Sequence, residues 1–378
     1  MRGFVAFGLL GRMAIAMLSL GIVLMIAGLT GSYGTAGLIA GVSVLAGAAG
    51  APLLGRLADR YGQGRVVTLA VPVHCVGLVG LAGSAVLGAP TWVLGVWAVV
   101  TGGCYPPVGP FVRARWAHRL SGSPKLNSAY ALESVFDELL FVTGPVLVTL
   151  LATRVHATAG LAAALVVTVV GGIGFVRQRA TDPPPQVRDG RSGFALRQPV
   201  VFLVTLVTLT AGVSLGALDV AVVAFTDASG VPWAAGLVLA LFAAGSAAGG
   251  LTYGALPLRV DPLARVVATG TLLGVAFLPL AFLSSIGLVA AFAFVSGVAI
   301  APLIVSCTTL VERVQKDTLT ESLTWVTTGI LVGVAVGSWL AGRVADLTAG
   351  SGGFLVVTPA AVLAAAVTWL TALVLRRR

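Results

Sequence analysis

The sequence predicts an all-α membrane protein in which about twelve helices cross the bilayer as two pseudo-symmetric bundles of about six. Three observations lead to this fold class. Of the 378 residues, 58% are hydrophobic and only 10% are charged, whereas soluble domains carry about 25% charged residues. Apolar runs long enough to span the hydrocarbon follow one another along the chain. When these runs are taken as spans, nearly all basic residues fall on one side of the membrane.

Turn residues and charges separate the apolar runs, and each separation is expected to mark the end of a span. The first run, residues 1–29, is too long for the core of a signal peptide and is interpreted as a retained helix. In the fourth run, Pro106, Pro107 and Pro110 are expected to bend the helix. The expected centres of the spans are Leu20, Leu45, Gly77, Val99, Val142, Val166, Leu209, Leu239, Leu273, Phe294, Val332 and Ala364.

The net charge of +10 is explained by the loops that carry it. With the N-terminus placed in the cytoplasm, every basic residue except Arg154 and Arg343 falls in a cytoplasmic segment. Both termini are therefore expected in the cytoplasm, where the basic excess faces anionic lipid and needs no nucleic-acid partner. The abundance of Ala, Gly, Val and Arg suggests a high-GC bacterium, and hence a multi-pass protein of the cell inner membrane.

The longest polar stretch, Arg177 to Pro199, contains three consecutive prolines and predicts a linker. It divides the chain into an N-terminal bundle (1–176), a cytoplasmic linker (177–199) and a C-terminal bundle (200–378). Two weak internal repeats at an offset of about 193 residues support this division. "GRLAD" from Gly55 is similar to "GGLTY" from Gly249, and "TGPVL" from Thr143 is similar to "VGSWL" from Val336.

The segment "GRLADRYGQGRV" is expected to form a short cytoplasmic turn between the second and third spans. Gly62 allows a tight reversal, and Asp59 can accept hydrogen bonds at the positive end of a helix. The segment resembles the loop signature of the major facilitator superfamily. Gln63 and Gly64 stand where the family pattern has two basic residues. The matching residues, with the displaced arginine, are Gly55, Leu57, Ala58, Asp59, Arg60, Gly62 and Arg65.

This resemblance implies alternating access, in which two six-helix bundles rock about a central site and the Asp59 loop holds the outward-facing state against the eleventh span. That span carries small residues at four-residue spacing, which let helices approach closely. The match to drug–proton antiporters is weaker, because the fourth span lacks their arginine and only part of their fifth-span motif remains. The residues expected to serve helix packing are Gly144, Pro145, Gly329, Gly333 and Gly337.

Three carboxylates, Glu133, Asp137 and Glu138, lie in the cytoplasmic third of the fifth span. Glu133 and Asp137 are four residues apart and share a helix face, whereas Glu138 is turned by about 100°. The acids could form a structural ion-pair cluster at the inner gate, or they could relay protons or substrate, and both roles can coexist. The possible counter-charges are Arg12, Arg113 and Arg115.

Asp219, in "SLGALDVAVVAF", is the other candidate for proton coupling. It follows a long uncharged run and precedes six more apolar residues. It is either a boundary residue at the outer end of the seventh span or an intramembrane residue that faces the transport cavity. Both alternatives stay open at this point.

The predicted function is secondary active transport, with proton-coupled export (antiport) of a small organic molecule or drug by a monomer. A sugar or metabolite permease is the alternative within the class, and a non-transporting receptor or scaffold is the alternative outside it. The chain has no phosphate-binding loop, nucleophile elbow or zinc-type His pair, so no enzyme activity, cofactor or metal is expected. Its expected partners are a small-molecule substrate, protons and the lipid bilayer.

Overall fold

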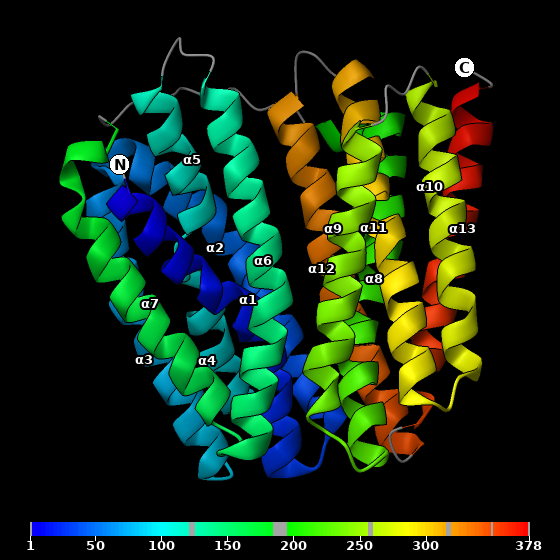
Figure 1. Ribbon diagram of the computed structural model, residues 1–378, viewed down its shortest axis with the longest axis horizontal. Coiled ribbons are helices and arrows are strands. Elements are labelled where there is room, and N and C mark those ends of the chain that lie inside the picture. The colour runs from blue at the N-terminus through cyan, green and yellow to red at the C-terminus, as the bar shows by residue number, and fades with distance from the viewer. Residues whose placement is uncertain are drawn as a thin grey trace. The chain divides into compact units, whose positions relative to one another are not determined.

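The computed structural model describes residues 2–120, 125–183, 195–255, 260–314, 319–348 and 351–376, and each regular element in these ranges is a helix (Figure 1). Within this described part, 11 helices are long and apolar enough to cross a membrane. Every expected span centre lies inside a helix. The all-α membrane fold that the composition predicted is therefore confirmed.

The fourth expected span consists of two shorter helices, α4 (Thr91–Gly103) and α5 (Val108–Arg119). The chain leaves the helical conformation between them, at Pro106 and Pro107. A proline lacks the backbone N–H and disfavours a helical conformation in the residue before it, so two in succession end a helix. Pro110 causes no bend, because it lies in the first turn of α5, where its N–H would have no partner within the helix.

The described helices belong to two compact units. Unit 1 comprises Met1–Gly31 and Val42–Asp189, and in it α1 packs against α6 and α7 while α3 packs against α4 and α7. Its further elements are α1 (Arg2–Thr30), α2 (Tyr33–Tyr61) from Val42 onward, α3 (Gln63–Val86), α6 (Lys125–Arg154), α7 (Ala159–Arg177) and the short helix η1 (Arg179–Thr181).

Unit 2 comprises Ser32–Gly41, which contains the first turns of α2, and Gly190–Arg378. Much of the expected linker, residues 184–194, lies outside the described residues. The elements of unit 2 are η2 (Ala195–Arg197), α8 (Pro199–Ala228), α9 (Ala234–Ala255), α10 (Pro262–Phe277), η3 (Leu278–Phe282), α11 (Ile286–Val314), α12 (Leu319–Leu347), η4 (Ser351–Gly353) and α13 (Phe354–Arg376).

The neighbouring helices of the two units correspond in chain order. The pairs α1–α6 and α1–α7 in unit 1 match α8–α12 and α8–α13 in unit 2. Likewise, α3–α4 and α3–α7 match α10–α11 and α10–α13. Each unit therefore has the same arrangement of six spans, as expected of a protein built from two repeats.

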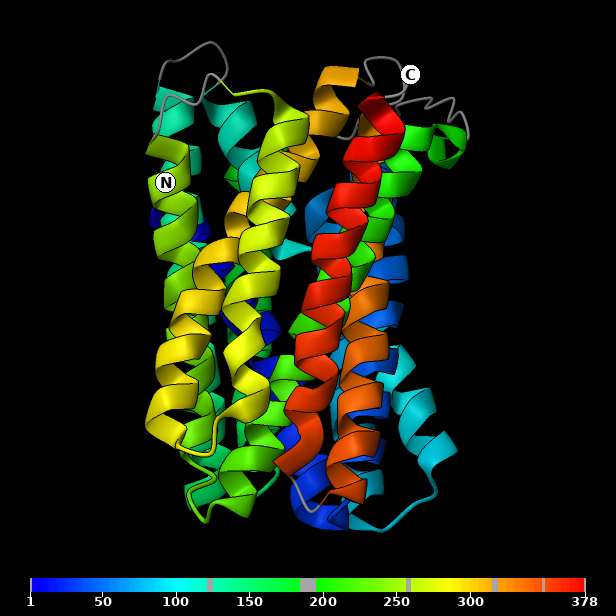
Figure 2. The ribbon, with the colours of Figure 1, turned by 90° about the vertical axis from the view of Figure 1, so that its right-hand side faces the viewer.

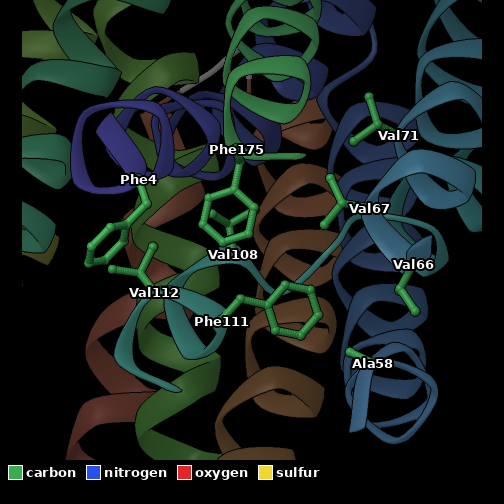
Figure 3. Close-up of a cluster of buried hydrophobic side chains, with 9 residues drawn as sticks. All are labelled: Phe4, Ala58, Val66, Val67, Val71, Val108, Phe111, Val112 and Phe175. Carbon is green, nitrogen blue, oxygen red and sulfur yellow. The ribbon is translucent and has the colours of Figure 1, made fainter. Parts of the chain in front are cut away.

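A cluster of apolar side chains holds one end of unit 1 together (Figure 3). Phe4 from α1, Val67 from α3, Phe111 from α5 and Phe175 from α7 are all buried in it. The four helices that carry these side chains meet beside Gly62, the single residue between α2 and α3. The cluster therefore places the loop signature against α5 and the end of α7.

Glycines allow a close helix crossing between α8 and α12 in unit 2. A methyl group added at Gly333 of α12 would lie 2.0 Å from the carbonyl oxygen of Leu209 on α8, and one at Gly337 would lie 2.0 Å from that of Val213. The two helices therefore touch through their backbones. Gly329 completes this face, since its added methyl group would lie 2.6 Å from the carbonyl oxygen of Thr205.

We predict that Gly333→Ala lowers the free energy of unfolding by about 1–3 kcal/mol, because the added methyl group meets backbone that cannot move without opening the α8–α12 crossing. The matched control is Gly95→Ala in α4, where an added methyl group would meet no atom within 4 Å. That control is expected to be neutral or stabilising by about 0.5–1 kcal/mol. Thermal and denaturant unfolding in detergent measure both, and equal effects would contradict this packing.

Candidate functional site

The Arg12 guanidinium is the centre of the polar cluster in unit 1. Its Nη2 donates to Oε2 of Glu133, its Nη1 donates to Oδ1 of Asp137 at 2.7 Å, and its Nε donates to the carbonyl of Gly8 at 3.3 Å. Glu133 and Asp137 reach the same guanidinium because they are one turn apart on α6. One arginine of α1 thus holds both carboxylates of α6.

Two residues of α5 complete the cluster. Arg113 Nη2 donates to Oδ2 of Asp137 at 2.8 Å, and Trp116 Nε1 donates to Oε1 of Glu133 at 2.8 Å. Each carboxylate oxygen therefore accepts one hydrogen bond. The two acids and the two arginines also cancel in charge, so α1, α5 and α6 meet at a neutral cluster.

Burial divides this cluster into two parts. The side chains of Arg12 and Glu133 are 5% and 0% exposed, whereas those of Asp137 and Arg113 are 27% and 44% exposed. An ion pair at the surface contributes little to stability, but loss of one partner from a buried pair is costly. The Arg12–Glu133 pair is therefore the part on which the packing of α1 against α6 depends.

Gly144 of α6, one of the residues expected to serve helix packing, lies against α1 beyond this cluster. A methyl group added at Gly144 of α6 would lie 2.7 Å from Cβ of Ala16 on α1, one helical turn beyond Arg12. Pro145 follows it inside α6. The small residue lets the two helices approach closely enough for the ion pairs to form. Glu138 belongs to α6, but its side chain lies outside the described residues.

Arg115 was expected to join the inner-gate ion pairs, but its partners are different. Its guanidinium is fully buried, donates to Gln63 Oε1 at 3.0 Å and Thr181 Oγ1 at 2.9 Å, and lies 3.6 Å from the ring centroid of Phe175. It also donates to the carbonyl oxygens of Phe175 and Gln178, both at 3.3 Å. Arg115 thus joins α5 to the start of α3 and the end of α7.

Gln63, where the chain departs from the family pattern, belongs to this second network. Its Nε2 donates to the carbonyl of Phe111 at 3.3 Å while its oxygen accepts from Arg115. Gly62 has a φ of 91°, which favours glycine, and the backbone N–H of Gly64 donates to Asp182 at 3.1 Å. The buried glutamine thus joins the loop to α5, and its oxygen accepts from Arg115, which a lysine or arginine side chain could not do.

The remaining residues of the loop signature lie toward its surface. Asp59 and Arg65 are exposed, and the Arg60 guanidinium lies 5.2 Å from the ring centroid of Tyr61. Gly55 has open space around it, with no atom within 4 Å of an added methyl group. Leu57 is partly buried against the apolar cluster of unit 1. Asp59 therefore remains available for the gating role that the resemblance implies.

Asp219 stands in contrast to the acids of α6. It is a half-buried residue inside α8, with nine helical residues after it, or about 13 Å of helix. It is therefore more than two turns from the end of its helix. No ion pair or hydrogen bond joins it to another group within the described part of the chain. Its charge thus lacks the compensation that Glu133 and Asp137 have.

Another polar cluster, in unit 2, holds the first turn of α2. Asp346 of α12 accepts hydrogen bonds from the backbone N–H groups of Tyr33 (2.7 Å) and Gly34 (2.9 Å) and from the Ser32 hydroxyl (3.0 Å). The Tyr33 hydroxyl donates to Asp227 of α8 at 2.6 Å. A carboxylate stabilises the start of a helix, here from a distant helix. The sequence analysis missed this cluster, because the capping acid is more than 300 residues from the helix it caps.

Comparisons with known proteins agree with this architecture. The sequence profile of the Major Facilitator Superfamily matches residues 4–282. The chain belongs to this superfamily, and it is a multi-pass membrane transporter of the secondary type rather than an enzyme. A search of curated protein sequences gives no match.

Solved structures of nucleoside transporter NupG share the fold. A mutant of NupG has a TM-score of 0.78 at 12% identity, over 97% of this chain and 99% of that chain. A second NupG structure has a TM-score of 0.74 at 14% identity, over 98% of this chain and 97% of that chain. These identities are low, so the likeness shows the fold alone.

We predict that Arg12→Leu lowers the free energy of unfolding by about 3 kcal/mol or more, because it leaves Glu133 charged and buried without a cation. Arg113→Leu, at the exposed edge, is expected to cost less than about 1 kcal/mol. The double variant Arg12→Leu/Glu133→Leu removes the buried pair whole and keeps Arg113 with Asp137, so it should recover most of the loss. Denaturant unfolding of the three variants measures this order, and similar losses for both single variants would contradict it.

Proposed function

We propose that this transporter moves a small organic solute by alternating access, and that proton movement through Asp219 drives the transport. Export in exchange for protons is the proposed direction. The proposed setting is the inner membrane of a bacterium, with both termini in the cytoplasm and the protein working as a monomer.

The observation that carries the proposal is the uncompensated carboxylate of Asp219. A charged side chain deep in the hydrocarbon costs about 2.5–3.5 kcal/mol on insertion scales. Proton binding removes this charge, and proton release restores it. Because the described residues offer Asp219 no cation, the negative charge that appears on proton release has no neutralising partner in unit 2. Such a change can bias a transport step, which is what coupling requires.

The acids of α6 support a different role. Glu133 and Asp137 are already neutralised by Arg12 and Arg113, and a proton would have to displace one of these partners. We therefore propose that they are structural residues that hold α1, α5 and α6 together. A change in these pairs during the transport cycle remains compatible with that role.

The direction of transport rests on the resemblance to bacterial efflux members and on the short connections between spans. Uptake of a metabolite is the alternative. NupG, whose fold this chain shares, is a nucleoside transporter. Nucleosides therefore belong in any panel of candidate solutes, beside organic cations, antibiotics and sugars.

We predict that liposomes containing the purified protein accumulate at least one solute of this panel when a proton gradient is imposed. An acid interior drives accumulation by antiport, and an acid exterior drives it by symport. The polarity of the proton gradient that supports accumulation therefore distinguishes export from uptake. Asp219→Asn keeps the shape of the side chain but cannot carry the proton, and it should lower gradient-driven accumulation at least about tenfold.

Glu312→Gln is the matched control, because it removes one exposed carboxylate from α11 and should leave accumulation unchanged. Accumulation by Asp219→Asn at the wild-type rate would refute the assignment of Asp219. If no solute of the panel responds to either gradient, proton-driven transport of these classes is refuted, and a receptor or scaffold role becomes the better account.

A further inference from the structure

An apolar groove runs between α10 and α13 on an outer face of unit 2. These helices lie side by side in both views (Figure 1, Figure 2). The groove has a volume of about 480 Å³ and ends at Arg376, the last described residue of α13. Ala264 and Ala268 line it from α10, and Trp369 and Ala372 line it from α13.

The groove exists because small residues lie beside a close helix crossing. A methyl group added at Gly270 would lie 2.3 Å from Cγ2 of Thr368, so α10 and α13 touch there. Toward Arg376, the side chains that face each other are short, with Ala264 and Ala268 four residues apart on one side of α10. Two helices in contact with short side chains on their facing surfaces leave a channel between them.

The inner end of the groove, away from Arg376, is lined by apolar side chains and by polar atoms that already have hydrogen-bond partners. Trp369 Nε1 donates to the hydroxyl of Thr271 at 3.0 Å, so the indole N–H needs no further partner there. The Trp369 side chain is 54% exposed and Leu373 beside the groove is 56% exposed, which places both on a surface that faces lipid in a membrane protein. This end suits an alkyl chain and has no free group for a polar solute.

The outer end is basic and uncompensated. Arg376 is exposed and has no ion pair with the described residues. Arg265, in the same turn of α10 as Ala264, uses its Nε for the carbonyl of Val260. The nearby acid, Asp261, is already paired with Arg313 at 3.0 Å. A net positive charge therefore remains at the mouth of a hydrocarbon groove.

We propose that this groove binds an anionic phospholipid, with one acyl chain against Ala268 and Trp369 and the phosphate at Arg376. Trp369 and Arg376 are seven residues apart, or about 10 Å along the helix, which is about two thirds of one leaflet of hydrocarbon. A phosphate held at the mouth by an arginine gains from charge-assisted hydrogen bonds, and a lipid headgroup gains from each basic residue near the surface. A free phosphate would leave the groove unfilled.

The test is native mass spectrometry of the purified full chain in detergent, with phosphatidylglycerol or phosphatidylcholine added at equal concentration. Wild type is expected to retain phosphatidylglycerol in preference. Arg376→Gln should weaken its retention about fivefold, the effect of one basic residue near an anionic headgroup. Ala268→Trp fills the groove and should abolish the retention of the phosphatidylglycerol molecule bound there.

Two controls match these variants. Arg177→Gln removes an exposed arginine from the end of α7, and Val275→Trp adds the same bulk at an exposed position of α10 outside the groove. Both should bind as wild type does. Ala268→Leu, with a smaller side chain, repeats the filling test in case the tryptophan variant does not fold.

The proposal is overturned if the filled variants and Val275→Trp retain equal amounts of phosphatidylglycerol, because the lipid then binds elsewhere. It is also overturned if phosphatidylcholine binds as well as phosphatidylglycerol, or if Arg376→Gln and Arg177→Gln behave alike. Those results would mean that the mouth of the groove does not select an anionic headgroup.

Discussion

The Arg12 guanidinium binds Glu133 and Asp137 at once, and the packing of three helices in unit 1 depends on that interaction. A charged group within membrane helices is costly when it has no partner, and here α1 supplies the cation while α6 supplies both anions. Arg113 and Trp116 of α5 satisfy the remaining oxygens. The absence of a side chain at Gly144 then lets α1 and α6 approach closely. Charge and packing therefore support each other at this crossing.

Unit 2 has the same order of helices, but its charges are arranged differently. At the equivalent crossing, α8 meets α12 through glycines and backbone carbonyl oxygens, without an ion pair among its described residues. The acid of α8, Asp219, has no cation to balance it. Under the proposed function, the neutral cluster of unit 1 is structural, and Asp219 of unit 2 is the group that would bind and release the proton. The two units share one arrangement of helices, and a few side chains give them different proposed roles.

Much of the fold follows from the sequence, because hydrophobicity and charge act along the chain. The positions of the spans, the helix break at Pro106 and Pro107, and the reversal at Gly62 all have local physical causes. The site is only partly predictable, because its contacts join residues that are far apart in the chain. Helical periodicity places Glu133 and Asp137 on one face, but it does not tell which helix lies opposite.

Particular residues show where this limit falls. Arg12 and Arg113 were named as counter-charges for the acids of α6, and the structure places them within hydrogen-bond distance. Arg115, two residues along the same helix, faces Gln63 and the end of α7 instead. The role of Gln63 was missed, because its partner is about 50 residues away and no local pattern connects them. Short-range pattern identifies the charged groups, and long-range packing decides their partners.

The central claim is that Asp219 couples transport to protons and is not needed for the movement of solute itself. Solute exchange at equal pH on both sides of a liposome tests this directly, because exchange requires binding and alternating access but no net proton movement. The account predicts that Asp219→Asn exchanges labelled solute at a rate near that of wild type while it cannot accumulate solute against a gradient. Loss of exchange together with accumulation would contradict the account, since Asp219 would then serve solute binding or the structure of unit 2.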